Sequence, residues 1–600
     1  MSDRLLAYYN QELEDIQRLA GEFAAAHPKI AGRLRLSADA IDDPHAGRLI
    51  EAFAFIAGRL RLKIDDDFPE LTETLLDVLY PHYLAPIPSA AICQFEPTAD
   101  FSEGSLVPRG TLLESEPIEG DICRFRTTQA VDLWPIAVQS ATLSGRPLLA
   151  PPAPRLEAAA SLRLVLRCLD PEQTFTRLGV DRLRFYIRAP WRQAVALYEL
   201  LLNRTVGIAL ADHAEDQAAT FLGPSAIRGV GFDTEEALIP PAPRSFPGYR
   251  LLTELFACPQ KFLFLELSGI SAKALRHAGN TLEVFFYLKH QTPELERAVT
   301  QDTFALGCTP IVNLFSQRAE PIQLTHELSE YPLVADVRRH ATREIYSVDR
   351  VVVTDRSGHQ RIATPFFVRG TDHHGDALHW LLRRRRLQTG DSSTDVMLAF
   401  VDTAFHPVAT ADRVVSVETT CLNRDLPAQL PYGGLHPVLR AIEGPAAVTA
   451  VRTLMPFTPT LRLPAGGGLL WRLMSHLLLN HLSLVDAAGG ADALREMLRL
   501  YDYRDTPETR ALISGIGTIK HRRSTARVRS GGLACGLDVE LEIDPRHTDV
   551  GMAYLFGAVF ERFLSLYANL NSFTRLTVRP TGASDPLGTW PARTGDRPLL

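Results

Sequence analysis

The stretch Leu79-Tyr80-Pro81-His82-Tyr83-Leu84-Ala85-Pro86-Ile87-Pro88-Ser89 divides this chain into two kinds of sequence. Before it, apolar residues recur at helical spacing. After it, short runs of β-branched and aromatic residues alternate with Gly, Pro and Asp turns. Proline lacks a backbone N–H and clashes inside a helix, so Pro81 is expected to end the helical part. The pattern predicts a helical arm over residues 1–89 and a strand-rich body behind it.

The arm is expected to contain three helices. The first covers about residues 3–26, and spacings of three and four place six apolar side chains on one stripe: Leu6, Tyr9, Leu13, Ile16, Leu19 and Phe23. The second covers about residues 44–64. The third follows Asp65-Asp66-Asp67, has Pro69 in its first turn, carries apolar residues from Leu71 to Leu79 and ends at Pro81. Such a stripe packs either within its own domain or against another chain. The residues alone leave these two possibilities open, although six apolar side chains at the chain end make the stripe a candidate partner interface.

The remaining residues predict an α+β, multidomain fold, because one hydrophobic core stops growing at roughly 250–300 residues and the chain has 600. A strand-rich domain is expected over 90–245, a strand-rich α+β domain over 246–430, and a mixed helix and strand domain over 431–600. Helices are expected at 191–203, 469–485, 491–501 and 549–568, and an irregular tail after Val578. The clearest strands are expected at 162–169, 183–187, 262–267, 282–288, 346–353, 524–529 and 537–543.

Composition argues against several classes of function. The net charge is −7 and the sequence pI is about 6.2, whereas nucleic acids and membrane surfaces require a basic face. No signal peptide and no apolar run long enough for a membrane span is visible. The seven cysteines are scattered without a CxxC-type pair, which favours a reducing compartment. We therefore expect a cytoplasmic protein that neither inserts into a membrane nor binds nucleic acid.

Motifs of catalysis are missing: there is no phosphate loop, dinucleotide-binding fingerprint, nucleophile elbow or HExxH. The best metal candidate is a cluster of Asp372, His373, His374 and Asp376, with His379 just beyond it. Asp and His are suitable ligands for a divalent ion, and the cluster keeps a metal-dependent enzyme open as an alternative. The favoured interpretation is a polar turn leading into a helix around 377–382.

Arg383-Arg384-Arg385-Arg386 is the only basic run of arginines. It could bind phosphate. Because it follows Trp380-Leu381-Leu382 in an acidic chain, we expect a solvated helix end, where cations suit the helix dipole, or a salt bridge to protein.

Several phrases together resemble the TssF (VasA/ImpG) family of type VI secretion baseplate proteins. They occur in the family's order over nearly the whole chain. The phrases are Tyr8-Tyr9-Asn10-Gln11-Glu12-Leu13, Asp66-Asp67-Phe68-Pro69-Glu70, Tyr80-Pro81-His82-Tyr83-Leu84-Ala85-Pro86, Cys421-Leu422-Asn423-Arg424-Asp425-Leu426-Pro427, Trp471-Arg472-Leu473, Asn480-His481-Leu482 and Asn571-Ser572-Phe573-Thr574.

The resemblance implies a structural protein without catalytic motif, metal or cofactor. In that family, two TssF copies join one TssG in a wedge that TssK and TssE complete, and six wedges surround the VgrG hub of a contractile machine. The wedge is docked on the inner-membrane complex, and TssF copies associate with one another inside it. The family is related to wedge proteins of contractile phage tails, so a phage-like baseplate remains an alternative. Helices of the three subunits form a shared bundle there, which favours an intermolecular role for the arm.

Overall fold

The structure is a computed structural model of the chain. It describes residues 5, 6, 8–10, 12, 13, 16, 19, 29, 44–65, 75, 76, 81–98, 103–153, 155–241, 247–276, 278–325, 327–367, 378–386, 394–402, 413–442, 448–463, 490–527, 532–566, 568 and 572–595. The chain forms two compact units. One comprises Met1–Leu79 with Pro464–Leu478, and the other comprises Tyr80–Leu463 with Leu479–Leu600. We describe each unit by itself.

The first unit contains the helix α3 (Pro44–Asp65), 22 residues long, as the sequence predicts. On one face of α3, Ala54 is fully buried and Gly58 is buried too. A Cβ added at Gly58 would lie 3.1 Å from the backbone nitrogen of Tyr9. Small residues on this face therefore let the segment at Tyr8 and Tyr9 approach closely. Only isolated positions of the expected first helix are described, so the long N-terminal arm as a whole stays a prediction.

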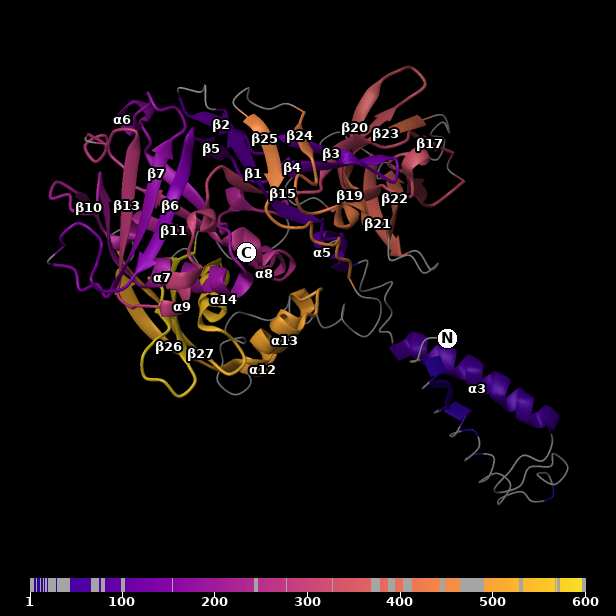
Figure 1. The fold of residues 1–600 in the computed structure, drawn as a ribbon. Coiled ribbons are helices and arrows are strands. Elements are labelled where there is room, and N and C mark those ends of the chain that lie inside the picture. The colour runs from indigo at the N-terminus through magenta and orange to yellow at the C-terminus, as the bar shows by residue number, and fades with distance from the viewer. Residues whose placement is uncertain are drawn as a thin grey trace. The chain divides into compact units, whose positions relative to one another are not determined.

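The second unit begins at α5 (Pro81–Leu84) (Figure 1). Pro81 opens this short helix, which differs from its predicted role as a stop. Proline is tolerated in a first helical turn because the N–H there has no partner within the helix. The residues after it are anchored: Tyr83 donates a hydrogen bond to the Leu500 carbonyl at 3.2 Å, and Ile87 pairs with Leu461.

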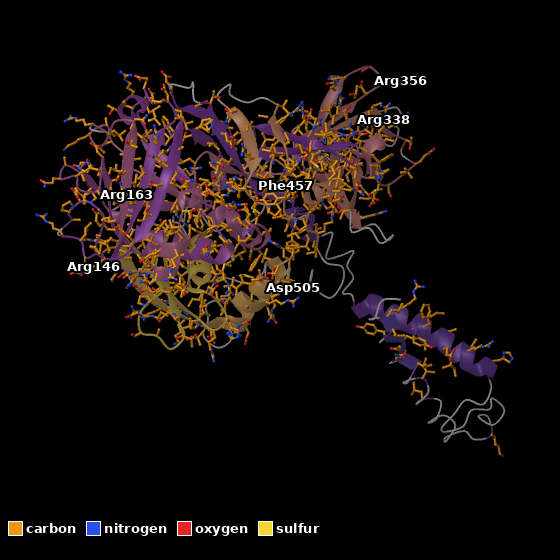
Figure 2. The ribbon with its side chains drawn as sticks, viewed as in Figure 1. Arg146, Arg163, Arg338, Arg356, Phe457 and Asp505 are labelled. Carbon is orange, nitrogen blue, oxygen red and sulfur yellow. The ribbon has the colours of Figure 1, made fainter. Side chains whose placement is uncertain are left out.

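A closed six-stranded barrel follows, in which alternate side chains point inward. Its strands are, in order around the barrel, β1 (Ala90–Pro97), β15 (Cys308–Val312), β4 (Asp121–Thr127), β3 (Leu112–Ile118), β24 (Leu439–Ala441) and β25 (Val448–Thr453). The alternating burial of β4 shows why these residues form a strand with one face in the core. Phe457 lies within this part of the molecule (Figure 2), and its ring stacks on Phe125 with centroids 4.3 Å apart.

Two antiparallel sheets lie next along the chain. The five-stranded sheet has the order β10 (Thr220–Leu222), β9 (Thr205–Ala211), β13 (Thr281–Leu288), β7 (Ala160–Cys168) and β6 (Ile136–Ser144). The four-stranded sheet has the order β11 (Ile227–Val230), β12 (Phe264–Ser268), β8 (Arg182–Ile187) and β14 (Phe304–Ala305). A small ribbon pairs β2 (Ser105–Val107) with β5 (Val131–Leu133). Short helices α6 (Phe175–Leu178) and α9 (Pro293–Ala298) lie in the connections.

An eight-stranded sheet is built mainly from residues after the barrel strand β15. It contains β16 (Phe315–Arg318), β23 (Arg413–Leu422), β19 (Glu344–Thr354), β20 (Gln360–Pro365), β21 (Leu378–Arg386), β22 (Thr394–Asp402) and β18 (Tyr331–Leu333), with β17 (Ile322–Leu324) paired to β23. The prediction of a helix around 377–382 is wrong, because residues 378–382 belong to β21. The nine residues of β21 pair with β22 from Leu378 to Arg386, and this tertiary pairing overrides the local pattern.

The C-terminal part combines a sheet with three helices. The sheet contains β26 (Ile516–Arg527), β27 (Leu533–Ile543), β28 (Ser572–Pro580), β29 (Gly588–Thr589) and β30 (Arg593–Thr594). The helices are α12 (Gly490–Tyr501), α13 (Pro507–Ser514) and the apolar α14 (Val550–Leu566), which packs on β28, on α7 (Trp191–Asn203) and on α8 (Pro247–Ala257) (Figure 1). The tail after Val578 is more regular than predicted, because β29 and β30 pair with β28.

The helices predicted at 44–64, 191–203, 491–501 and 549–568 are confirmed, and so are the predicted strands other than 524–529, each within about four residues. The strand predicted at 524–529 falls on the end of β26, which begins eight residues earlier, at Ile516. The predicted helix 469–485 lies outside the described residues. Strand pairing crosses both expected internal boundaries, since β13 pairs with β7 and β24 pairs with β3. The division into domains at residues 245 and 430 stays a prediction. Any domains with these boundaries would share strands of the same sheet or barrel. The mixed α+β, multidomain class itself is confirmed.

Candidate functional site

Among the described residues of the first unit, α3 carries a stripe of exposed apolar side chains. Leu49, Phe53, Ile56 and Leu60 follow one another at helical spacing and are 74%, 63%, 63% and 61% exposed. We call these four residues the α3 stripe. Large side chains on one helix face are normally buried, and a contiguous exposed set marks an interaction site. The opposite face, with Ala54, is already covered.

The six candidate interface residues of the first helix are described in part. Leu6 and Leu19 are 47% and 54% exposed. Tyr9, Leu13 and Ile16 are partly buried. Phe23 lies outside the described residues. The stripe predicted on this helix therefore stays a candidate interface, while the α3 stripe carries the larger exposed fractions.

The metal candidates Asp372, His373, His374 and Asp376 lie outside the described residues. His379 is described and lies on β21, where it is buried. Its Nδ1 is 2.9 Å from the Thr364 hydroxyl. In the described ranges, no three His, Cys, Asp or Glu side chains converge as metal ligands would.

The arginine run is divided between the two faces of β21. Arg383 and Arg385 both contact Glu330, at 2.6 and 2.5 Å. Arg384 points to the other face, is buried, and donates to the carbonyls of Ile345 and Tyr346. The prediction of a helix end is wrong, and the predicted protein salt bridge is confirmed. Successive side chains of a strand point to opposite faces of the sheet, so the four arginines are divided between an exposed face and a buried face.

A buried ionic cluster joins α8 to the segments around it. We call Glu254, Arg250 and Lys261 the Glu254 cluster. Glu254 and Lys261 are fully buried and in direct contact, and Arg250 lies 3.1 Å from the same carboxylate. Glu254 also accepts the backbone N–H groups of Leu238 and Ile239, both at 2.9 Å. Both oxygens of the carboxylate thus accept hydrogen bonds from donors within the protein.

The electrostatics of this cluster follow from its burial. Desolvation alone would raise the pKa of Glu254, but the Arg250 and Lys261 cations outweigh it and hold that pKa below its usual range. Desolvation lowers the pKa of Lys261 to about 8 against the attraction of Glu254. Strongly shifted groups often mark active sites. Here the charged groups pair with one another inside the protein, which indicates that the cluster stabilises the fold.

An asparagine pair explains one of the family-like phrases. Asn313 and Asn423 are both fully buried. The Asn423 side chain accepts from Asn313 at 2.8 Å and from the Arg124 backbone N–H at 3.0 Å, and donates to the Ile122 carbonyl at 3.1 Å. These bonds tie the end of β23 to the barrel strand β4. The sequence analysis singled out the segment around Asn423. The structure shows its role, which is to hydrogen-bond the end of β23 to β4.

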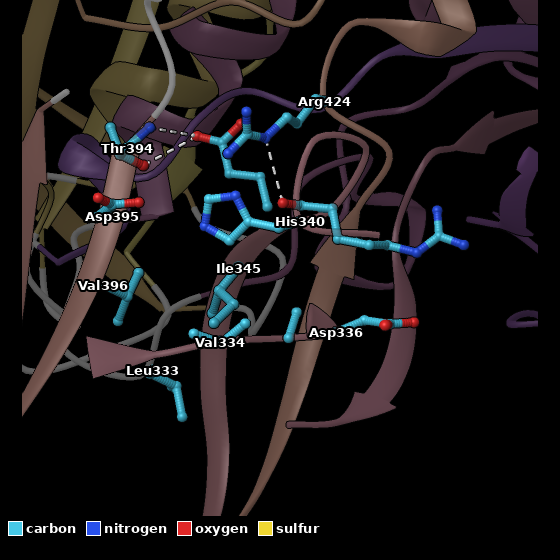
Figure 3. A pocket seen from close by; sticks show the side chains of 12 residues that line it. Leu333, Val334, Asp336, His340, Ile345, Thr394, Asp395, Val396 and Arg424 are labelled. Atoms are coloured by element: carbon cyan, nitrogen blue, oxygen red, sulfur yellow. Dashed lines mark hydrogen bonds between the residues drawn. The ribbon is translucent and has the colours of Figure 1, made fainter. Parts of the chain in front are cut away.

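A polar hollow lies beside this asparagine pair, with about 310 Å³ of free space that includes open solvent. Glu344 accepts hydrogen bonds from the backbone N–H and the hydroxyl of Thr394, at 3.2 and 2.9 Å. Thr394, His340 and Arg424 line the same hollow (Figure 3). Glu344 also pairs with Arg462 at 2.6 Å. The charge of Glu344 is therefore already neutralised inside the protein. The polar groups that line the hollow are engaged in hydrogen bonds and ion pairs that join neighbouring segments.

The cysteines have the character of core residues. All seven are free, and six are buried. Desolvation raises the pKa of Cys123 to about 12 and those of Cys168, Cys258 and Cys421 to about 11. Such thiols stay protonated at neutral pH and are poor nucleophiles and ligands. Cys535 alone is exposed.

The interior holds buried ion pairs, a hydrogen-bonded asparagine pair and protonated thiols, and α3 exposes an apolar stripe. These features describe a multidomain α+β protein with a surface suited to a protein partner. Among the described helices, none is long and apolar enough to span a membrane. The family profile "Type VI secretion system, TssF" matches residues 1–597. The chain therefore belongs to the TssF family of type VI secretion baseplate components.

Individual relatives agree with this assignment. The chain is 36% identical over 627 aligned residues to type VI secretion system component TssF1 of Pseudomonas aeruginosa, and the alignment covers all of both chains. A chain in the cryo-electron microscopy structure of the TssK-TssF-TssG baseplate subcomplex is 29% identical, with a TM-score of 0.73 over 92% of this chain and 99% of that one. A chain in the baseplate complex of the type VI secretion system is 26% identical, with a TM-score of 0.60 over 99% of this chain and 100% of that one.

Proposed function

We propose that the chain is a non-enzymatic subunit of a type VI secretion baseplate wedge, and that the α3 stripe packs into a helical bundle shared with a TssG partner. The observation that carries this proposal is the exposed stripe itself. Four large apolar side chains, each more than 60% exposed, face away from the buried face of their own helix. Burying the exposed part of them, about two thirds of each side chain, would contribute about 4 to 8 kcal/mol in total, since full burial of one side chain of this size contributes about 1.5 to 3 kcal/mol.

The proposed partners follow from the relatives. TssK and TssG share a complex with the TssF of the subcomplex described above. We extend both contacts to this chain, with two copies of it per TssG and with self-association between the copies. TssE and the VgrG hub complete the proposed wedge, on the cytoplasmic side of the inner-membrane complex. The first-helix residues Leu6, Tyr9, Leu13, Ile16, Leu19 and Phe23 are proposed as a second contribution to the bundle.

Co-expression with the TssG encoded in the same gene cluster tests the proposal. Wild-type chain is expected to form a complex that holds more copies of this chain than of TssG, as measured by size exclusion with light scattering. Phe53→Asp and Ile56→Asp place a charge on the stripe, which an apolar bundle cannot accommodate. Both variants should lose the complex and keep the circular dichroism of the wild type, because the side chains are exposed in the isolated chain.

Arg59→Asp is the matched control, since Arg59 is exposed on α3 outside the stripe. It should assemble like the wild type. Normal assembly of Phe53→Asp would refute the proposed bundle, and unfolding of the isolated variant chain would show that the stripe is covered by its own unit.

A further inference from the structure

The edge of the C-terminal sheet is open at β26. β26 pairs with β27 on one side, and no strand pairs with its other side in the part of the chain that the structure describes. Arg495 of α12 covers the start of β26 by donating to the Ile516 carbonyl at 3.0 Å. Beyond that point, every second residue of an edge strand turns its N–H and C=O outward, where another strand can bind them.

The outer half of the β26–β27 hairpin projects beyond the core. Along one face of β27 the exposed fraction is 0% at Leu541, 2% at Val539 and 8% at Leu537, and then 79% at Leu533. Helix α14 packs on the sheet near Val578, which is the β28 neighbour of Leu541. The helix therefore covers this face of the sheet near Leu541, whereas the same face at the outer end of β27 exposes Leu533.

The charges of β26 are of one sign. Between Ile516 and Arg527 the strand has four cationic side chains, one histidine and no carboxylate: Lys520, His521, Arg522, Arg523 and Arg527. Lys520 and Arg522 are held by Glu542 and Asp538, at 3.3 and 3.6 Å. The side chains of Arg523 and Arg527 are exposed and have no ion pair or hydrogen bond to another described residue. In a chain of net charge −7, this is a local concentration of unmatched positive charge.

We propose that the open edge of β26 is a docking site for an extended acidic segment of a partner protein, which adds to the sheet as a further strand. The backbone edge supplies main-chain hydrogen bonds, and Arg523 and Arg527 supply charge complementarity. A second copy of this chain is disfavoured at this edge, because two β26 strands side by side would oppose like charges. The site is separate from the α3 stripe, so either proposal can fail alone.

The full-length chain is tested with a fluorescent peptide of about twelve residues in which glutamate alternates with valine and threonine. Anisotropy should report binding, and a peptide with lysine in place of glutamate should not bind. Arg523→Glu with Arg527→Glu should weaken binding by about tenfold or more, which corresponds to about 1.4 kcal/mol. Arg499→Glu, at an exposed site on α12, should bind like the wild type.

Hydrogen exchange distinguishes strand addition from diffuse attraction. Bound peptide should slow exchange at amides within residues 519–527. Equal affinity of the double variant and the Arg499→Glu control would overturn the proposal, and so would unchanged exchange in β26. The cations would then be explained as charges that prevent aggregation through the strand edge. Tighter binding of a single-stranded oligonucleotide of equal charge would also overturn it, in favour of nucleic acid.

Discussion

Replacing the buried carboxylate of the Glu254 cluster should loosen α8. Glu254→Gln keeps the shape of the side chain and one acceptor for the backbone donors, but removes the only charge that compensates Arg250 and Lys261 within the cluster. Breaking a buried ion pair by removing one partner costs about 3 to 5 kcal/mol, because the remaining charge stays desolvated. The full burial of Glu254 and Lys261 places this site in that regime.

Hydrogen exchange within α8 measures the effect directly. A loss of about 3 to 5 kcal/mol in local opening free energy should accelerate exchange of residues 247–257 by about a hundredfold to several thousandfold. The double variant Glu254→Gln, Lys261→Met removes one uncompensated cation and should recover part of the loss. Exchange within about fivefold of the wild type, equivalent to about 1 kcal/mol, would refute the reasoning.

The same cluster predicts a pH dependence. The pKa of Glu254 is lower in the folded chain than its ordinary value. A carboxyl of this kind stabilises the fold above its unfolded pKa of about 4.3, and that stability is lost as pH falls through the folded pKa. Acid should therefore loosen α8 in the wild type below about pH 4. Glu254→Gln should show a flatter profile there.

Three further outcomes are expected. Asn423→Ala should lower the urea midpoint by an amount equivalent to about 2 to 5 kcal/mol, because it strips partners from the buried Asn313 amide and from the partly buried Arg124 N–H and Ile122 carbonyl; an unchanged midpoint would contradict this. Under native conditions only Cys535 should react quickly with a thiol reagent at neutral pH, and Cys535→Ser should abolish the fast phase. Gly551→Ala should lower the melting temperature, since its Cβ would lie 2.5 Å from the Val195 carbonyl, whereas Gly532→Ala meets nothing within 4 Å and should not.

Much of the local structure could be predicted from the sequence because its signals are local. α7 begins and ends where the apolar period begins and ends, from Trp191 to Asn203. β21 shows the limit. Its leucines and arginines suit a helix, and only pairing with β22 makes the segment a strand. The short strands β29 and β30 are likewise set by pairing with β28, a contact that the sequence around them does not encode.

The sequence by itself determined the family, the helical period of α3 and the absence of familiar catalytic motifs, because each is written in neighbouring residues. Only the tertiary structure decided which face of α3 is covered, where the four arginines point and which carboxylates are neutralised. It also decided that β26 is an edge, a property that depends on what lies beside a strand. Each of these features depends on residues or segments that are brought together only by the fold, as Glu254 and Lys261 are. The desolvation that strengthens such contacts exists only once the core has formed.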